Sequence, residues 1–442
     1  MNVHQIPFIR LLLPYIAGII IAWCTISYTI AIFVSALSAC VWIADLLYFS
    51  HKGYNMRHIQ GICITLLFIA VGITSYNLAL PAGLQEKKCL TSYQVYQFYK
   101  TNNNPTLLET KALEIRESLI DIYKKHTSEA NTGIISAITL GKKDGIDRET
   151  KQLFSMSGGS HVLAVSGLHV GIIYMIMLWL TALIPRRRMT IIISHTITIL
   201  CLWIYAFICG LPASVVRSAL MFSLMSVAVI IERNNVSLNA VFASAFIMLM
   251  YKPLYLFDVG FQLSYAAVIS IMLFYPKLHS VLTLKNRLLS VAWSMICVSV
   301  AAQIGTLPLT VYYFHQVPTY SLLTNFLVIP AAFLIIYLSA SMLIMNQLHI
   351  IPELLGKAAD TVTSFLRMGV DYIVSLPYSV IDGLRIDGWL VLGIFAAILS
   401  FYAFTESRKA RELILSLSIV AILQCIDILI QIKFVTLLVL KI

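Results

Sequence analysis

Apolar stretches of about 20 residues recur along almost the whole chain, and no other feature restricts its fold as strongly. About 20 helical residues cross a hydrocarbon core of ~30 Å. The stretches are continuous and do not alternate between apolar and polar positions, so they indicate helices and not the strands of a membrane barrel. We place them near residues 8–27, 29–49, 58–79, 161–184, 188–208, 211–231, 236–251, 255–275, 288–314, 320–346, 388–404 and 413–438.

Composition supports the same fold class. Hydrophobic residues make up 59% of the 442 positions and charged residues only 12%, whereas soluble domains carry about 25% charged residues. We therefore predict an all-α polytopic integral membrane protein with about 10–12 transmembrane or re-entrant helices. An additional amphipathic helix is expected on its outer side.

The formal net charge of +11 would suit a nucleic-acid-binding protein, but its distribution gives another explanation. Basic residues gather in the cytoplasmic loops of membrane proteins. This pattern predicts a cytoplasmic N-terminus and an extracytoplasmic position for residues 81–160. Most of the excess lies before the first stretch or in alternate short loops, at Arg10, Lys52, Arg57, Arg186, Arg187, Arg188, Arg233, Lys277, Lys285, Arg287, Arg408, Lys409 and Arg411.

One region conflicts with this alternation. The stretch 320–346 should end inside the cell, whereas the stretch 388–404 should begin outside it. Either residues 350–380 cross the bilayer or a neighbouring segment is re-entrant, and Pro330 is a candidate break within 320–346. The sequence leaves this choice open.

The chain divides into three parts. Residues 1–80 form an N-terminal three-span segment, residues 81–160 a short extracytoplasmic polar segment, and residues 161–442 the main membrane bundle. Within the polar segment, apolar residues at helical spacing predict an amphipathic helix over 106–126, lying on the outer membrane surface or on the bundle. A second short helix should end at Leu140, with Gly141 as its C-cap.

The most unusual stretch runs from Gly158 to Gly171 (GGSHVLAVSGLHVG). Glycine and serine residues open a predicted span there, and the free N–H groups of such a helix start attract phosphate or carboxylate. Ser166 and His169 are three residues apart and share one helix face. A structural explanation competes with this one: Gly167 and Gly171 allow close helix packing, and His169 bonds a neighbouring carbonyl.

Polar residues also interrupt later spans. Arg217 lies inside the predicted span 211–231, where a charge costs roughly 2.5–3.5 kcal/mol on insertion scales and should therefore face protein or water. An ion pair with Asp258 would be one structural explanation. Asp258 could instead cap the helix that follows it. Gln303 and Asn325 add polar groups to two further apolar stretches.

Taken together, these segments resemble the ComEC-type competence family, the inner-membrane DNA internalisation proteins of naturally transformable bacteria. They occur in the family's order over about residues 130–340, which resembles its membrane competence domain. The string HVLAVSGLHVG is a specific signal, and residues 161–442 then form a competence-type bundle. The resemblance rests on Leu140-Gly141, His161 to Gly171 (HVLAVSGLHVG), Gly210 to Arg217, Asp258 to Ser264 (DVGFQLS), and Gln303 with Pro308, Phe314, Asn325 and Pro330.

The resemblance implies an inner-membrane channel that imports single-stranded DNA during natural transformation. It also implies separate DNA-receptor, nuclease and cytoplasmic motor proteins as partners, besides the lipid bilayer, and leaves open whether the chain forms a homo-oligomer. We predict no cofactor and no metal, and the chain has no P-loop with which to use ATP. The residues implied to line or gate the DNA path are His161, Ser166, His169, Arg217, Asp258, Gln262, Gln303 and Asn325.

Two departures from the family pattern affect this expectation. Family members commonly carry an OB-type domain after the first spans, but here only about 26 residues separate Leu80 from the predicted amphipathic helix, too few for five strands. Longer members also end in a metallo-β-lactamase-like domain. No HxHxDH-like cluster occurs in this sequence, so we expect no nuclease activity from this chain and do not predict an enzyme.

Two other functions remain open. The first is a transporter of another anionic substrate on the same scaffold. The second is an intramembrane serine hydrolase that uses Ser166 as its nucleophile. That chemistry needs a base within about 2.6–3.2 Å of the hydroxyl. Since residues at i and i+3 of one helix rarely orient in this way, His195 from a different span is the candidate base.

Overall fold

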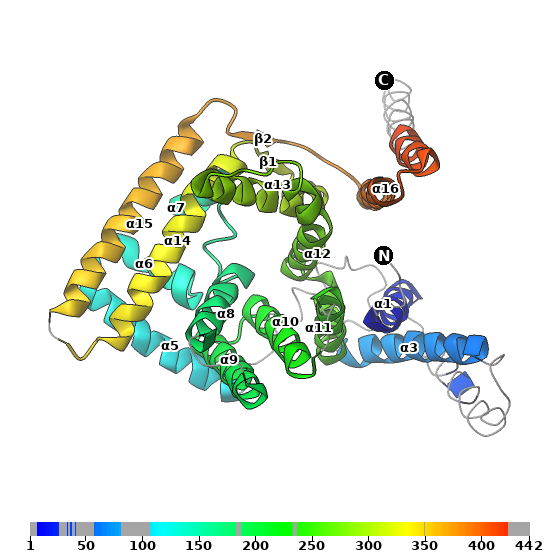
Figure 1. Cartoon of the computed structure of the whole chain (residues 1–442), viewed down its shortest axis with the longest axis horizontal. Helices are drawn as coiled ribbons and strands as arrows, with labels where there is room; N and C mark the ends of the chain where they lie inside the picture. Colours follow the sequence, from blue (N-terminus) through cyan, green and yellow to red (C-terminus); the bar gives the residue numbers. More distant parts are fainter. Residues whose placement is uncertain are drawn as a thin grey trace, which may run out of the picture. The chain divides into compact units, whose positions relative to one another are not determined.

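The computed structural model describes residues 7–25, 33, 36–37, 40, 57–80, 107–182, 187–232, 237–348 and 350–422 (Figure 1). Nearly all of them are helical. The elements are α1 (Pro7–Thr25), α3 (Arg57–Ala79), α5 (Leu107–His126), α6 (Glu129–Leu140), α7 (Arg148–Met156), α8 (Gly167–Ala182), α9 (Arg188–Ile208), α10 (Ala213–Ile230), α11 (Ser237–Tyr251), the 3₁₀ helix η4 (Pro253–Phe257), α12 (Val259–His279), α13 (Arg287–Phe314), β1 (Gln316–Pro318), α14 (Ser321–Ile344), α15 (Ile351–Ser375), β2 (Val380–Asp382) and α16 (Gly388–Ser407). Residues 410–422 are also helical.

Eight of the described helices are long and apolar enough to cross a membrane: α1, α3, α9, α10, α12, α13, α14 and α16. Two shorter helices, α8 and α11, are apolar as well. The predicted class, an all-α polytopic membrane protein, is therefore confirmed. The predicted stretch 29–49, apart from isolated positions, and the end of the stretch 413–438 lie outside the described residues.

The structure decides one point that the sequence left open. Helix α14 continues through Pro330 without a break, so this proline does not interrupt the span. Proline is tolerated inside membrane helices because neighbouring groups and small local adjustments satisfy the backbone carbonyl that it frees.

Two helix starts also differ from the predicted spans. Residues 157–166 form turns, so α8 begins only at Gly167. The stretch that begins at Tyr255 is 3₁₀-helical up to Phe257, and α12 follows it at Val259.

The chain forms two compact units, which we describe separately. The first contains residues 1–147, 161–265 and 330–366, and the second contains residues 148–160, 266–329 and 367–442.

In the first unit, α1 and α3 pack against each other, and two glycines lie at their contact. A Cβ atom added to Gly18 would lie 2.1 Å from the carbonyl oxygen of Ile69, and one added to Gly72 would lie 2.3 Å from that of Tyr15. Small residues at such positions let membrane helices approach backbone to backbone.

Helices α8, α9 and α10 form an apolar cluster in the first unit. Val170 of α8, Leu202 of α9 and Val215 of α10 are all fully buried in it. The rings of Tyr174 and Phe222 stack at its edge, with 4.8 Å between their centroids. The cluster fixes the position of the turns that precede α8.

Helix α6 is buried on all sides within the first unit, from Asn131 to Leu140. A Cβ atom added to Gly133 would lie 2.2 Å from the carbonyl oxygen of Gly145. Gly141 follows in the left-handed conformation, with φ of 77°, and its N–H bonds to the carbonyl of Ala137, which confirms the predicted C-cap. A helix that is buried all round is a core element.

The second unit contains α7, α13, α16 and the parts of α12, α14 and α15 nearest to them in sequence. Its two-stranded antiparallel sheet pairs β1 with β2, with Val317 opposite Ile381. Lys277, near the end of α12, forms an ion pair with Glu406, near the end of α16, at 2.8 Å.

Candidate functional site

The motif stretch ends in a helix cap built from Ser166 and His169. The backbone N–H of Ser166 donates to Nδ1 of His169 (3.0 Å), and the Ser166 hydroxyl lies 3.1 Å from the same nitrogen. The N–H of Leu168 donates to the Ser166 Oγ atom (3.3 Å). This arrangement is a form of capping box in which histidine takes the place of the usual glutamate or glutamine. It satisfies N–H groups at the start of α8.

The histidine of this cap is fully buried. Because Nδ1 accepts a hydrogen bond from a backbone N–H, it carries no hydrogen, and the neutral ring has its hydrogen on Nε2. This Nε2 atom is buried and has no hydrogen-bond partner among the described residues. His161, the other histidine of the motif, is exposed. His169 therefore presents one buried donor beyond the cap itself.

Gly167 and Gly171 face α10. A Cβ atom added to Gly167 would lie 3.1 Å from the Ser218 hydroxyl, and one added to Gly171 would lie 3.4 Å from the ring of Phe222. The hydroxyl of Ser214, in the first turn of α10, donates to the carbonyl of Val165 (2.8 Å). These contacts hold the motif against α10.

Arg217 lies inside α10 and is 4% exposed. Its guanidinium carbon is 5.7 Å from the ring centroid of Tyr265 in α12. The Tyr265 hydroxyl is in turn 3.0 Å from the hydroxyl of Ser244 in α11. Cation–π contacts contribute about 0.5–2 kcal/mol, most where water is excluded. The side chain thus faces protein, as a charge within an apolar span requires.

Asp258 and Gln262 organise the start of α12. The Asp258 carboxylate accepts the N–H of Phe261 (2.9 Å), which is a helix cap. The side-chain amide of Gln262 donates to the carbonyl of Leu256 in η4 (2.9 Å). The capping explanation for Asp258 is therefore the one that the structure shows.

In the second unit, Gln303 and Asn325 belong to a polar seam between α13 and α14. The Gln303 amide donates to the Ser321 hydroxyl (2.6 Å), and the Asn325 amide donates to the Ser299 hydroxyl (3.0 Å). The Asn325 Oδ1 atom is buried and has no hydrogen-bond partner among the described residues. Interhelical bonds of this kind contribute about 0.6–2 kcal/mol in membranes.

The two glycines that open the motif pack against the same seam. Gly158 has φ of 83°, and a Cβ atom added to it would lie 2.9 Å from that of Ser321. The hydroxyl of Thr324 donates to the carbonyl of Ser157 (2.7 Å). Sequence reasoning missed the serine and threonine members of this seam. The available signal was helical spacing, since Ser321 lies four residues before Asn325 and Ser299 lies four residues before Gln303.

The eight residues predicted to line a path are thus divided between the units. His161, Ser166, His169, Arg217, Asp258 and Gln262 lie in the first unit, and Gln303 and Asn325 lie in the second.

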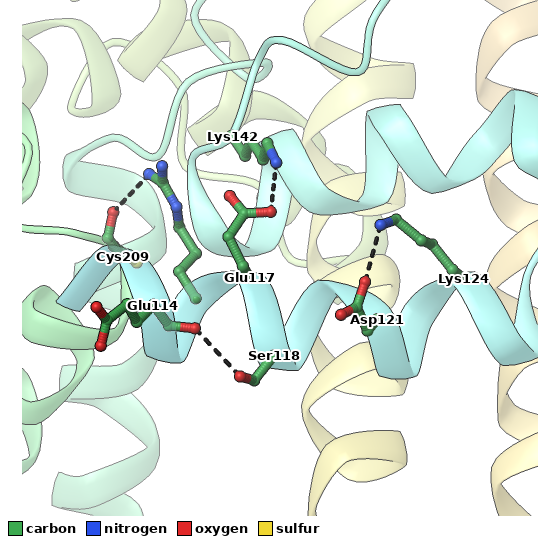
Figure 2. A network of polar contacts seen from close by, with 8 residues as sticks. Glu114, Glu117, Ser118, Asp121, Lys124, Lys142 and Cys209 are labelled. Carbon is green, nitrogen blue, oxygen red and sulfur yellow. Dashed lines mark hydrogen bonds and ion pairs between the residues drawn. The ribbon is translucent and has the colours of Figure 1, made fainter. Parts of the chain in front are cut away.

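Helix α5 is fixed to the first unit by its polar side chains (Figure 2). Arg116 donates to the carbonyl of Cys209 (3.2 Å) at the end of α9, where a cation is favourable to the helix dipole. Glu117 pairs with Lys142, which follows α6. Lys124, at 2.8 Å, lowers the pKa of the exposed Asp121 through a hydrogen bond and its charge.

These features define a multi-pass, all-α membrane protein in which capped helix starts and a buried arginine lie inside an apolar bundle. Residues 138–408 match the model of the family described as Competence protein, and the chain belongs to that family.

Three relatives show how much of the chain is shared. It is 31% identical to ComE operon protein 3 of Bacillus subtilis over 232 residues, which cover 52% of this chain and 28% of the relative. It is 26% identical to Recombination protein 2 of Haemophilus influenzae over 296 residues, 64% of this chain and 37% of the relative. It is 28% identical to an uncharacterized protein of Aquifex aeolicus over 212 residues, 48% of each chain. The matched part is therefore less than half the length of each relative. No solved structure matches the chain.

Proposed function

We propose that this protein forms the path by which single-stranded DNA crosses the bacterial inner membrane during natural transformation, with its N-terminus in the cytoplasm. The observation that carries this proposal is the match to the competence family over residues 138–408. Two relatives are named for the ComE operon and for recombination, which agrees with a role in acquiring DNA.

Physical chemistry supports a path inside the protein. A polyanion cannot cross hydrocarbon, so its route must be wet, polar and tolerant of phosphate. Arg217 supplies a buried positive charge, and His169 supplies a buried N–H donor. Both groups suit phosphate oxygens.

The test is a clean deletion in a strain that is shown to transform. We expect the deletion strain to retain labelled DNA at its surface but to lose label from the cytosol, and a copy supplied in trans to restore entry. Introducing the same DNA by electroporation controls for defects in recombination. Cytosolic uptake that equals that of the parent strain would refute the proposal.

Transport of another anionic substrate is the second candidate, since the buried arginine is not specific for DNA. Purified protein in vesicles separates the two. Import of labelled single-stranded DNA that is reduced by unlabelled DNA, but not by an equal charge of polyphosphate or heparin, favours DNA. Equal competition by all three polyanions favours the second candidate.

We further infer that Ser166 caps a helix and is not a nucleophile. The Nδ1 atom of His169 already accepts the Ser166 backbone N–H, so it is not free to act as a base toward the hydroxyl. His195, the candidate base, makes no hydrogen bond to Ser166 among the described residues. Failure of a fluorophosphonate probe to label Ser166 is the expected result. We propose, as the family resemblance implies, that the nuclease, the DNA receptor and the cytoplasmic motor are separate proteins.

A further inference from the structure

Helix α15 lies within residues 350–380, for which the sequence did not decide whether the chain crosses the membrane. It has 25 residues and is therefore about 37 Å long, enough to cross a hydrocarbon core of ~30 Å. It carries too many charged residues to be recognised as an apolar span. Its route must therefore be determined from the elements around it.

Helices α13 and α16 fix the two points between which the chain must travel. A Cβ atom added to Gly388, at the start of α16, would lie 3.9 Å from the ring of Tyr312, near the end of α13. At the other end of α16, Glu406 pairs with Lys277 of α12, and Trp293 of α13 donates to the carbonyl of His279 (3.3 Å). The two helices are therefore antiparallel. The end of α13 and the start of α16 lie on the same side of the membrane.

The small sheet places the end of α15 on the same side of the membrane as the end of α13. Strand β1 follows α13, strand β2 follows α15 after a short turn, and the two strands pair in antiparallel fashion. The N–H of Thr319, just before α14, donates to the carbonyl of Ser379 (3.1 Å). The chain thus leaves on α14 and has returned to the same side by the end of α15.

A chain that leaves and returns to one side must cross the membrane an even number of times. Helix α14 has 24 residues, none of them charged, and is among the apolar helices able to span. The second crossing then falls on α15. The two helices touch within the second unit, where a Cβ atom added to Gly369 would lie 2.3 Å from the side chain of Leu327 (Figure 1).

The surface of α15 divides into three faces. The packed face repeats at intervals of three and four residues and is buried: Pro352, Gly356, Ala359, Thr363, Leu366, Val370 and Ile373. A charged stripe follows the same intervals: Glu353, Lys357, Asp360, Ser364, Arg367 and Asp371. On the third face, Phe365, Met368 and Tyr372 are 61%, 64% and 67% exposed. A helix on the surface of a soluble protein needs only two faces, one toward the core and one toward water.

We propose that α15 crosses the membrane beside α14, with its apolar third face against lipid and its charged stripe lining a water-filled passage. Charged side chains within a span face protein or a wet cavity, and not hydrocarbon. Three acidic and two basic residues nearly balance the charge of the stripe. A polar cargo would therefore meet no strong binding position along the stripe. Conduction requires binding that is weak enough for the cargo to leave. The crossing itself holds whether or not the cargo is DNA.

The charge at the middle of the stripe is hydrogen-bonded by polar groups of the protein. Asp360 lies about 14 Å along α15, near the centre of the proposed crossing. Its carboxylate accepts the N–H (3.1 Å) and the hydroxyl (2.6 Å) of Ser128 and the side-chain amide of Asn131 (3.0 Å), at the start of α6. The positive end of α6 therefore offsets this charge.

Thiol labelling from each side of the membrane tests the crossing. In a background in which the eight native cysteines are replaced, Gln347→Cys marks the turn before α15 and Arg385→Cys marks the segment after β2. We expect a membrane-impermeant maleimide to label Arg385→Cys only in intact cells and Gln347→Cys only in inverted vesicles. Labelling of both positions from the same side would overturn the proposal, since α14 and α15 would then form a re-entrant pair.

A second set of variants tests the passage. Arg367→Cys and Asp371→Cys lie on the stripe, and Phe365→Cys and Met368→Cys lie on the third face at the same depth. We expect a charged methanethiosulfonate reagent to modify the stripe positions at least tenfold faster than the lipid-facing ones, and a lipid-soluble maleimide to show the reverse order. Equal rates at all four positions, or a stripe that the charged reagent does not reach, would refute a wet passage. Both experiments are read without DNA, so their failure is separate from a failure of DNA import.

Discussion

Asp360 and Ser128 are 232 positions apart in the chain, yet the carboxylate of one accepts both the backbone N–H and the hydroxyl of the other. The contact joins the start of α6 to the middle of α15. A Cβ atom added to the neighbouring Gly356 would lie 2.3 Å from the carbonyl oxygen of His126. The two segments are therefore in backbone contact as well as hydrogen-bonded.

Removing the charge of this junction should destabilise the protein. Asp360→Asn keeps the side-chain size but weakens the charge-assisted hydrogen bonds, and we expect a loss of about 1–3 kcal/mol, seen as a lower Tm in detergent. Asp371→Asn is the matched control, because Asp371 is exposed, and its Tm should change little. Equal shifts for the two variants would contradict a specific role for the junction.

Substitutions of Ser166 and His169 test the cap at the start of α8. Ser166→Ala should cost about 0.5–2 kcal/mol, whereas Ser166→Asn should retain most of the stability because asparagine is also a good N-cap. His169→Gln should be tolerated in the same way, since glutamine accepts the N-cap N–H in ordinary capping boxes. Thermal unfolding and transformation frequency are measured on the same variants. Loss of transformation in Ser166→Asn at unchanged Tm would instead point to chemistry at the hydroxyl.

Arg217 should be needed for transport more than for folding. We expect Arg217→Lys to retain part of the DNA import and Arg217→Gln to lower it at least tenfold, because only lysine keeps the positive charge. Arg188→Gln controls for a general loss of basic charge, since Arg188 is exposed. Import is measured as labelled DNA in the cytosol, normalised to the amount of protein in the membrane. Normal import by Arg217→Gln would remove this residue from the path.

The polar seam predicts a measurable coupling between α13 and α14. In a double-mutant cycle of Gln303→Leu and Ser321→Ala, we expect an interaction energy of about 0.6–2 kcal/mol in unfolding. Additive effects of the two substitutions would show that their hydrogen bond does not stabilise the helix pair.

Two glycines of the N-terminal helices offer a steric test. Gly18→Ala places a methyl group 2.1 Å from the Ile69 carbonyl oxygen, whereas Gly61→Ala in α3 meets nothing within 4 Å. The first should cost typically 1–3 kcal/mol or more and lower the amount of folded protein. The second should be neutral or slightly stabilising, because alanine favours helix. The yield of monodisperse protein in size-exclusion chromatography compares the two.

Local patterns were sufficient to predict most spans and one turn. Predicted and observed bounds agree closely for α9 and α13, because an uninterrupted apolar run has one interpretation at this length. The cap at Gly141 followed from the need for a left-handed residue after a helix. The effect of Pro330 could not be decided from the sequence, because it depends on neighbouring groups that the local sequence does not reveal.

The candidate site was less accessible to such reasoning. Ser166 and His169 could be paired from their spacing, but not the direction of their hydrogen bonds. The partners of Asp360, Gln303 and Asn325 lie on other helices, so no periodicity within one segment identifies them. The charged stripe of α15 was present in the sequence. Whether the helix that carries it crosses the membrane could be decided only from the positions of the ends of α13 and α16.

The burial of α6 on all sides also has a consequence for how the protein is made. Its partner Asp360 leaves the ribosome more than 200 residues later, and synthesis at about 5–20 residues per second delays that moment by roughly 10–50 seconds. A helix of 12 residues is too short to be stable alone for that time. The innermost helix of the first unit is therefore made early and completed last, so an assembly factor or the insertion machinery has a long interval in which to hold it.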